Sequence, residues 1–94
     1  MQKYKLGNTA LILASKFGQI VAINFLLIKG HDLAITNKNG NNALEEAIIN
    51  NQIESVKFLL NYFDSESVDF QKRILNCSIS NGNIEITEFL FQRV

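Results

Sequence analysis

A segment near the start of the chain returns 33 positions later with the same pattern of residues. Thr9-Ala10-Leu11-x-x-Ala14 recurs as Asn42-Ala43-Leu44-x-x-Ala47, and Phe25-Leu26-Leu27 recurs as Phe58-Leu59-Leu60. Self-similarity at a period of about 20–50 residues is typical of repeat arrays, in which each unit buries its apolar face against its neighbours. The spacing therefore predicts an array of stacked units.

Each copy predicts two short helices joined by a tight turn. In the first helix of copy one, Leu11 and Ala14 recur at helical spacing and form a narrow apolar face. Gly18 and its counterpart Asn51 follow the first helices, where a residue that tolerates a left-handed backbone is favoured. The four helices expected from these two copies span Ala10–Phe17, Ile20–Lys29, Ala43–Asn50 and Ile53–Tyr62.

The segment between the helix pairs predicts a hairpin loop, and a third copy follows it. Asn37–Asn42 is rich in turn-forming residues, and Asn39-Gly40 is a strong hairpin-turn signal. The third copy is shifted by 31 residues, so that Leu75 corresponds to Leu44, and its first helix is expected to start as early as Val68. The fold predicted is a single all-α domain of about three repeats, approximately 7–36, 37–66 and 67–94.

Composition excludes several classes of function. The 94 residues suffice for one domain, and 9 Lys+Arg balance 9 Asp+Glu, so that no net field attracts nucleic acid or an anionic membrane. No apolar run approaches the ~20 residues needed to span a bilayer. The single cysteine, Cys77, excludes an internal disulfide. We expect a soluble, intracellular and cytoplasmic protein that binds neither nucleic acid nor membrane.

The polar residues that could carry chemistry are not placed for it. Glu45 and Glu46 are adjacent, and neighbours on a helix point about 100° apart, so they are expected on a solvated face rather than as an acid–base pair. His31 has no second ligand at metal-binding spacing, and Cys77 is expected to be a buried, inert thiol. We therefore predict no catalytic residue, no cofactor and no metal.

These residues resemble the ankyrin repeat. The family pattern is matched by Gly7-Asn8-Thr9-Ala10-Leu11-Ile12-Leu13-Ala14-Ser15 and by Gly40-Asn41-Asn42-Ala43-Leu44-Glu45-Glu46-Ala47-Ile48. The match covers nearly the whole chain, strongly in two copies and partly in a third. The chain departs from the pattern at the usual proline, which is Ala10, Ala43 or Ile74, and this removes the fixed φ of a proline at the helix start. The resemblance implies a slightly curved stack of helix pairs that binds proteins and carries no reaction.

The resemblance also implies where a partner binds, because ankyrin arrays usually meet partners at the hairpin tips and on the concave side of the first helices. Phe17 and Ile49 could anchor a partner there, or could instead pack against a neighbouring repeat. Glu54 and Lys57 match positions on the opposite, convex side. The predicted binding surface consists of Lys5, Leu6, Asn8, Lys16, Phe17, Lys38, Asn39, Asn41, Ile49, Asn50, Ser80 and Asn81.

Three functions agree with this sequence. We favour a non-catalytic protein–protein interaction module that acts as a scaffold or adaptor. The first alternative is a targeting or regulatory segment of a larger enzyme or effector protein. The second is a structural unit that associates with itself, because nothing that resembles a polar cap precedes Gly7 and the ends of the array are expected to be uncapped.

Overall fold

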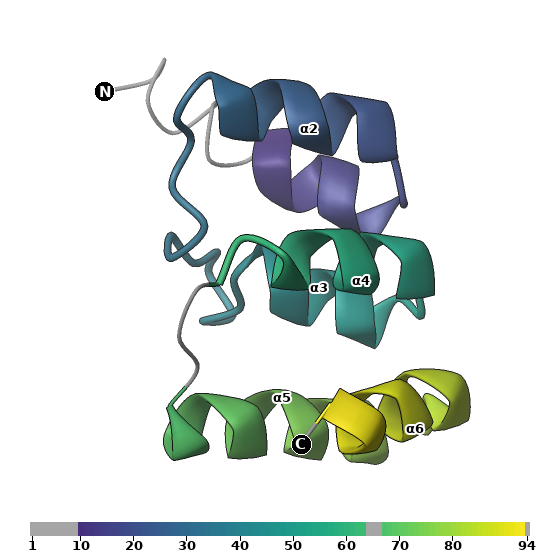
Figure 1. The fold of residues 1–94 in the computed structure, drawn as a ribbon. Helices are drawn as coiled ribbons and strands as arrows, with labels where there is room; N and C mark the ends of the chain where they lie inside the picture. Colours follow the sequence, from purple (N-terminus) through teal and green to yellow (C-terminus); the bar gives the residue numbers. More distant parts are fainter. Residues whose placement is uncertain (1–9, 64–66, 94) are drawn as a thin grey trace.

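The structure is a computed structural model that describes residues 10–63 and 67–93. These residues form helices and turns, without a strand, and the helices are stacked in pairs (Figure 1). The all-α ankyrin-type fold predicted from the repeat pattern is confirmed. Residues 10–16 are helical, and the helices that follow are α2 (Ile20–Ile28), α3 (Ala43–Ile49), α4 (Ile53–Leu60), α5 (Val68–Ser80) and α6 (Ile84–Arg93).

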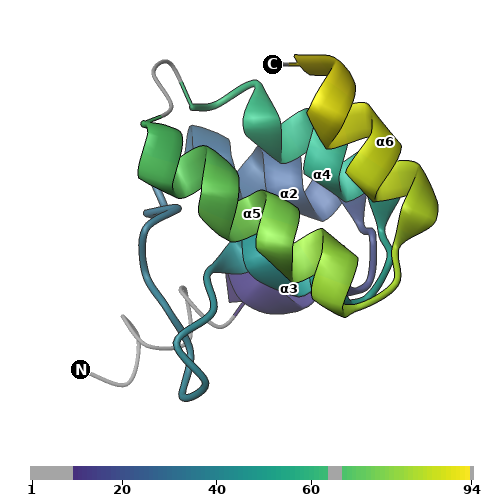
Figure 2. The same cartoon turned by 90° about the horizontal axis from the view of Figure 1, so that it is seen from below.

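The helices form two layers along the stack. The helical residues 10–16, α3 and α5 lie in one layer, and α2, α4 and α6 lie in the other (Figure 2). Contacts run between successive members of a layer, from α3 to α5, from α2 to α4 and from α4 to α6. The resulting body measures 37 × 24 × 23 Å along its principal axes. Each pair therefore packs mainly on the pairs before and after it, as in other solenoids.

The turn inside each helix pair has the left-handed residue that the repeat pattern predicted. Gly18, Asn51 and Gly82 occupy the same place in the three pairs, with φ angles of 71°, 57° and 69°. Asn is the residue that most readily replaces glycine at such a cap. The next backbone amide then bonds back to the preceding helix, as Gln52 N does to Ala47 O at 2.8 Å.

The hairpin between the first two pairs is closed by its own asparagines. Asn37 N donates to Asn41 O at 2.9 Å, and Gly40 has a φ of 78°, in the left-handed region where a side chain would be strained. The Asn37 side-chain Oδ1 accepts from Asn39 N at 3.0 Å and from Asn41 N at 3.1 Å. The turn-rich sequence thus forms the loop that was expected.

Two helices begin at capping residues that the sequence supplies. Asn42 accepts a hydrogen bond from Glu45 N at 2.8 Å, and the Glu45 side chain returns a bond from Asn42 N at 3.0 Å, which completes a capping box. Ser67 caps α5 by accepting from Phe70 N at 3.0 Å. This cap fixes the start of α5 at Val68, so the prediction of a lengthened helix is confirmed.

The core follows the repeat, with one difference at the end of the array. Leu11 and Leu44 are buried, at 1% and 0% exposure, whereas the third member of this set, Leu75, is only partly buried. Leu75 belongs to the third pair, and no further pair follows it among the described residues. Burial at this repeat position is therefore complete in the first two pairs and partial in the third.

We predict that Leu44→Ala strongly destabilises the chain. Leu44 is fully buried in the central pair, and large-to-small truncation in such a site costs about 2–5 kcal/mol. The measurement is urea unfolding followed by circular dichroism. Leu75→Ala serves as the matched control and should cost clearly less, because Leu75 is already partly exposed. Equal losses for the two variants would contradict the stacking described above.

Candidate protein-binding surface

The structure separates the predicted binding surface into two groups of residues. One group lies on the hairpin before α3. The other lies at the C-terminal ends of residues 10–16, α3 and α5, which we call the first-layer helices, on the far side of the stack from the hairpin (Figure 1). Lys5, Leu6 and Asn8 lie outside the described residues. The exposed members are Phe17, Lys38, Asn39, Ser80 and Asn81, and the partly buried members are Lys16, Asn41, Ile49 and Asn50.

Glu46 connects the two groups. Its Oε2 accepts from the side-chain amides of Asn37 at 2.9 Å and Asn41 at 3.1 Å, both of which lie on the hairpin. Its Oε1 accepts from the Asn50 amide at 3.4 Å, and the same amide donates to Glu46 O at 2.8 Å. One carboxylate therefore holds the hairpin and the end of α3 in a fixed relation.

Glu45 connects the same hairpin to the next repeat. Besides its part in the capping box, it forms an ion pair with Arg73 of α5, whose second nitrogen donates to Glu45 Oε1 at 3.2 Å. The Arg73 guanidinium also donates to Gly40 O at 2.9 Å. Arg73 thus links α5 both to α3 and to the tip of the hairpin.

The expectation that Glu45 and Glu46 lie on a solvated face is wrong. Both side chains are buried, with 4% and 8% exposure of the residues. Burial of a carboxylate is tolerated only where charged or polar partners compensate for the lost hydration, and both residues have such partners. Part of this arrangement could have been read from the sequence, because Asn42-x-x-Glu45 matches the capping-box spacing.

The two apolar members of the surface differ in exposure. Phe17 is 59% exposed, and Lys16 Nζ lies 5.6 Å from the centroid of its ring. The sequence left open whether Phe17 packs against a neighbouring repeat, and at this exposure less than half of its surface is covered. Ile49 is partly buried, so it offers a smaller apolar contact than Phe17.

Glu54 and Lys57, the two residues predicted to lie on the convex side, also differ in exposure. Glu54 is exposed, as expected from its place on the second helix. Lys57 is partly buried, and its Nζ lies 5.4 Å from the centroid of the Phe89 ring on α6. Lys57 therefore takes part in repeat packing, and only Glu54 is a suitable control for surface substitutions.

Cys77 is half-buried rather than fully buried as expected. Desolvation by burial raises the pKa of its thiol above the ordinary value, and the negative charges of Glu45 and Glu46 raise it further. Because the thiolate is the reactive form, a raised pKa lowers reactivity at neutral pH. Within residues 10–63 and 67–93, no three His, Cys, Asp or Glu side chains are grouped so that they could hold a metal.

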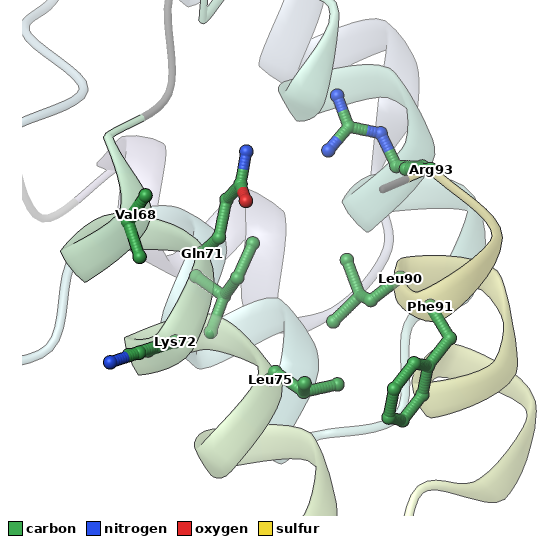
Figure 3. Close-up of a pocket in the computed structure, with 8 residues that line it drawn as sticks. Val68, Gln71, Lys72, Leu75, Leu90, Phe91 and Arg93 are labelled. Atoms are coloured by element: carbon green, nitrogen blue, oxygen red, sulfur yellow. The ribbon is translucent and has the colours of Figure 1, made fainter.

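The sequence did not reveal an apolar groove at the C-terminal end of the stack. The groove has a volume of about 280 Å³ and lies between α5 and α6, with Lys72 and Arg93 among the residues that line it (Figure 3). Its apolar lining includes Leu75, Leu90 and Phe91. Phe91 is 58% exposed, whereas Leu60, its counterpart one repeat earlier, is 3% exposed. The signal in the sequence is that the repeat places Phe91 at an apolar position of the repeat interface.

The comparisons with known proteins agree with this architecture. A family model of three ankyrin repeats matches residues 11–94. A fowlpox virus (strain NVSL) protein, FPV031, described as a putative ankyrin repeat protein, is 35% identical over 95 aligned positions, which cover 94% of this chain. The chain belongs to the ankyrin repeat family. It spans only 28% of the length of the fowlpox virus relative.

Membership of this family indicates a protein-interaction fold that is typically non-catalytic. None of the helices in the described part of the chain has the length and apolar character required to traverse a bilayer. The hairpin and the helix ends, where the sequence predicted that a partner binds, are the candidate site of this chain.

We predict that Glu46→Ala destabilises the fold and loosens the hairpin. The substitution removes the acceptor of the Asn37 and Asn41 amides, whereas the Asn50 amide keeps its bond to Glu46 O, and the loss of such an acceptor costs about 1–3 kcal/mol. Urea unfolding measures the stability, and amide hydrogen exchange measures hairpin protection. Glu54→Ala is the control and should change stability by less than about 0.5 kcal/mol. Unchanged exchange in the hairpin of Glu46→Ala would contradict the role given to this carboxylate.

We also predict that Cys77 reacts slowly with a thiol reagent at neutral pH. Its pKa is raised, so the thiolate fraction near neutral pH is smaller than for a free cysteine. The second-order rate with iodoacetamide, compared with that of a cysteine-containing peptide, measures the effect. Glu46→Gln removes one of the neighbouring negative charges and should raise the rate. A rate for the wild-type chain equal to that of the peptide would show the prediction to be wrong.

Proposed function

We propose that this chain is a non-catalytic scaffold or adaptor module that binds another protein through the hairpin and the ends of the first-layer helices. The observation that supports it most directly is the Glu46 network. This network fixes the hairpin to α3 and uses the Asn41 and Asn50 amides internally, while Lys38 and Asn39 at the tip stay exposed. A loop held in one conformation loses little conformational entropy when it binds, which favours affinity.

Within this surface, Phe17 is the residue best suited to anchor a partner. Its ring is mostly exposed, and large aromatic side chains supply much of the energy at protein interfaces. Lys38 and Asn39 would supply hydrogen bonds at the tip. The surface carries few charges, chiefly Lys16 and Lys38, so binding should depend only weakly on salt.

The test is affinity capture followed by quantitative binding. We expect proteins captured by the wild-type chain from its source cells, or from host cells, to be lost with Phe17→Ser combined with Lys38→Ala. Exposed contacts of this kind each contribute about 1–2 kcal/mol or more when they are hot spots, so the double variant should weaken binding at least about tenfold. Circular dichroism should show an unchanged helical signal, since both residues are exposed.

The matched control is Glu54→Ala on the convex side. It should bind like the wild-type chain, because it is exposed on α4 and lies outside the proposed surface. If Glu54→Ala weakened binding while the double variant did not, the partner would lie on the opposite side from the one proposed. Catalysis has no place in this proposal, and turnover of a captured protein would contradict it.

A second possibility is that the module serves a larger protein as its targeting or regulatory part. The fowlpox virus relative supports this possibility, because the matched chain spans only 28% of its length. The mass of the protein in extracts of its source, measured with an antibody against these residues, separates the two possibilities. We propose a cytoplasmic location in either case, which cell fractionation with the same antibody would test.

A further inference from the structure

The C-terminal face of the described stack exposes residues whose counterparts are buried inside the stack. Ile48 and Leu60 of the central pair are 0% and 3% exposed, whereas Ile79 and Phe91, 31 positions later, are 54% and 58% exposed. The difference is that another pair follows the central one. Phe91 lines the groove between α5 and α6 (Figure 3). Ile79 lies four positions after Leu75, which also lines the groove, and helical spacing places the two on the same side of α5. Ile79, Phe91 and the groove are therefore called the end face, and they are apolar like the buried positions to which they correspond.

The N-terminal end shows the opposite side of the same interface. Ser55 and Ile86 are 0% exposed in the second and third pairs, whereas their counterpart Ala22 on α2 is exposed. Phe25 is 57% exposed on the same helix, while its counterparts Phe58 and Phe89 are partly buried. In the second and third pairs, the residues at these positions are covered at least in part. On α2, no preceding pair covers them among the described residues.

We infer that the chain associates with itself head to tail, so that α2 of one copy packs on the α5–α6 end of the next and continues the stack. The occupant is a second copy because each end presents one of the two sides of the interface that α2, α4 and α6 already form within the chain. This inference does not rest on the proposed function, since it is argued from the two end faces and not from the hairpin, although Gln19 and Gly82 lie beside Phe17 and Asn81 of the proposed binding surface.

The repeat register predicts which residues meet across the junction. Within the chain, two contacts show how a pair meets the pair before it on the side of α2, α4 and α6. The rings of Phe58 on α4 and Tyr62 in the turn after it have centroids 5.6 Å apart, and Tyr62 Oη lies 3.4 Å from Asn24 Oδ1 on α2. In α6, the Phe89 ring lies under Lys57 Nζ of α4, at 5.4 Å.

The corresponding residues at the two ends have opposite charges. Phe25 on α2 and Lys29 at the C-cap of α2 are the counterparts of Phe58 and Tyr62, and Lys29 Nζ already lies 5.5 Å from the Phe25 ring centroid. The counterpart of Asn24 and Lys57 on α6 is Glu88, which is exposed. The register therefore places Glu88 of one copy against Lys29 of the next, and this ion pair favours the head-to-tail arrangement.

A second contact supports the same register. Gln52 covers the turn at Gly18, where a Cβ atom would collide with its Oε1, and Asn83 Nδ2 donates to Asn51 Oδ1 at 3.2 Å in the next junction. At Gly82, the last turn of this series, no described atom lies within 4 Å of the place of a Cβ. Gln19, the exposed counterpart of Gln52 and Asn83, would cover Gly82 of the neighbouring copy.

Head-to-tail contacts use different surfaces on the two copies, so they do not close into a dimer. Such heterologous interfaces continue into rings or open filaments. Sedimentation equilibrium should therefore show a weight-average mass that starts at the 10.6 kDa of one chain and rises with concentration beyond the mass of two. A plateau at two copies, or a single chain at every concentration, would overturn the inference.

Charge reversal tests the register. Lys29→Glu and Glu88→Lys each place like charges at every junction, and we expect each alone to weaken association about tenfold, a change typical of exchanging an attractive for a repulsive pair of surface charges. In an equimolar mixture, copies of the two variants can alternate along the stack. One junction then keeps the original pair of opposite charges, and the next joins the two substituted side chains, whose charges are also opposite. The mixture should therefore associate like the wild-type chain.

Two further variants make the result decisive. Glu54→Lys reverses an exposed charge on the convex side and should leave association unchanged. Ile79→Lys places a charge in the C-terminal end face and should abolish association while the helical signal is retained, since Ile79 is exposed. Failure of the mixture to restore association, or equal weakening by Glu54→Lys, would show that the two ends do not meet in this register.

Discussion

The fold depends on the burial of the central helix pair between its two neighbours. All residues of α3 except the last are buried, including both of its carboxylates, and α4 buries Ser55, Val56, Leu59 and Leu60. A single helix pair has two faces to cover and can cover neither alone, so each pair gains stability from the next. Among the three described pairs, the middle one is covered on both sides by described residues. Much of the stability that the described residues provide is therefore concentrated at this pair.

Most of the fold could be predicted from the sequence because the signals are local and occur more than once. The left-handed turns at Gly18 and Asn51, the Asn39-Gly40 hairpin and the cap at Ser67 each act within a few residues. The recurrence at 33 and 31 positions then fixed the pairing of helices without any knowledge of distant contacts. The partial burial of Leu75 could not be predicted in this way, because recurrence alone does not show which copies are covered on both sides.

The candidate site was harder to predict because its polar contacts join distant parts of the chain. Glu45 and Glu46 resemble a solvated pair when one helix is considered alone. Their burial depends on Arg73, which is 28 positions from Glu45, and on asparagines of the hairpin that form turns in addition to binding Glu46. The side-chain amides of Asn41 and Asn50 are for the same reason engaged within the fold. Repeat alignment places a residue on a face, whereas the partners of its polar atoms come only from the assembled structure.

The two proposed surfaces lie on different parts of the array, and this difference has a consequence for binding. Successive pairs stack along one axis, with the hairpin at the edge of the stack and the end faces perpendicular to the axis (Figures 1 and 2). Addition of a second copy at either end would leave Lys38 and Asn39 exposed and would place a second hairpin on the same side. Linked binding sites of this kind raise the overall affinity for a partner that also has more than one site, by effective concentration and without any new contact. An array that extends itself would thus bind a multivalent partner more tightly than a single copy does, while a partner with one site would gain nothing.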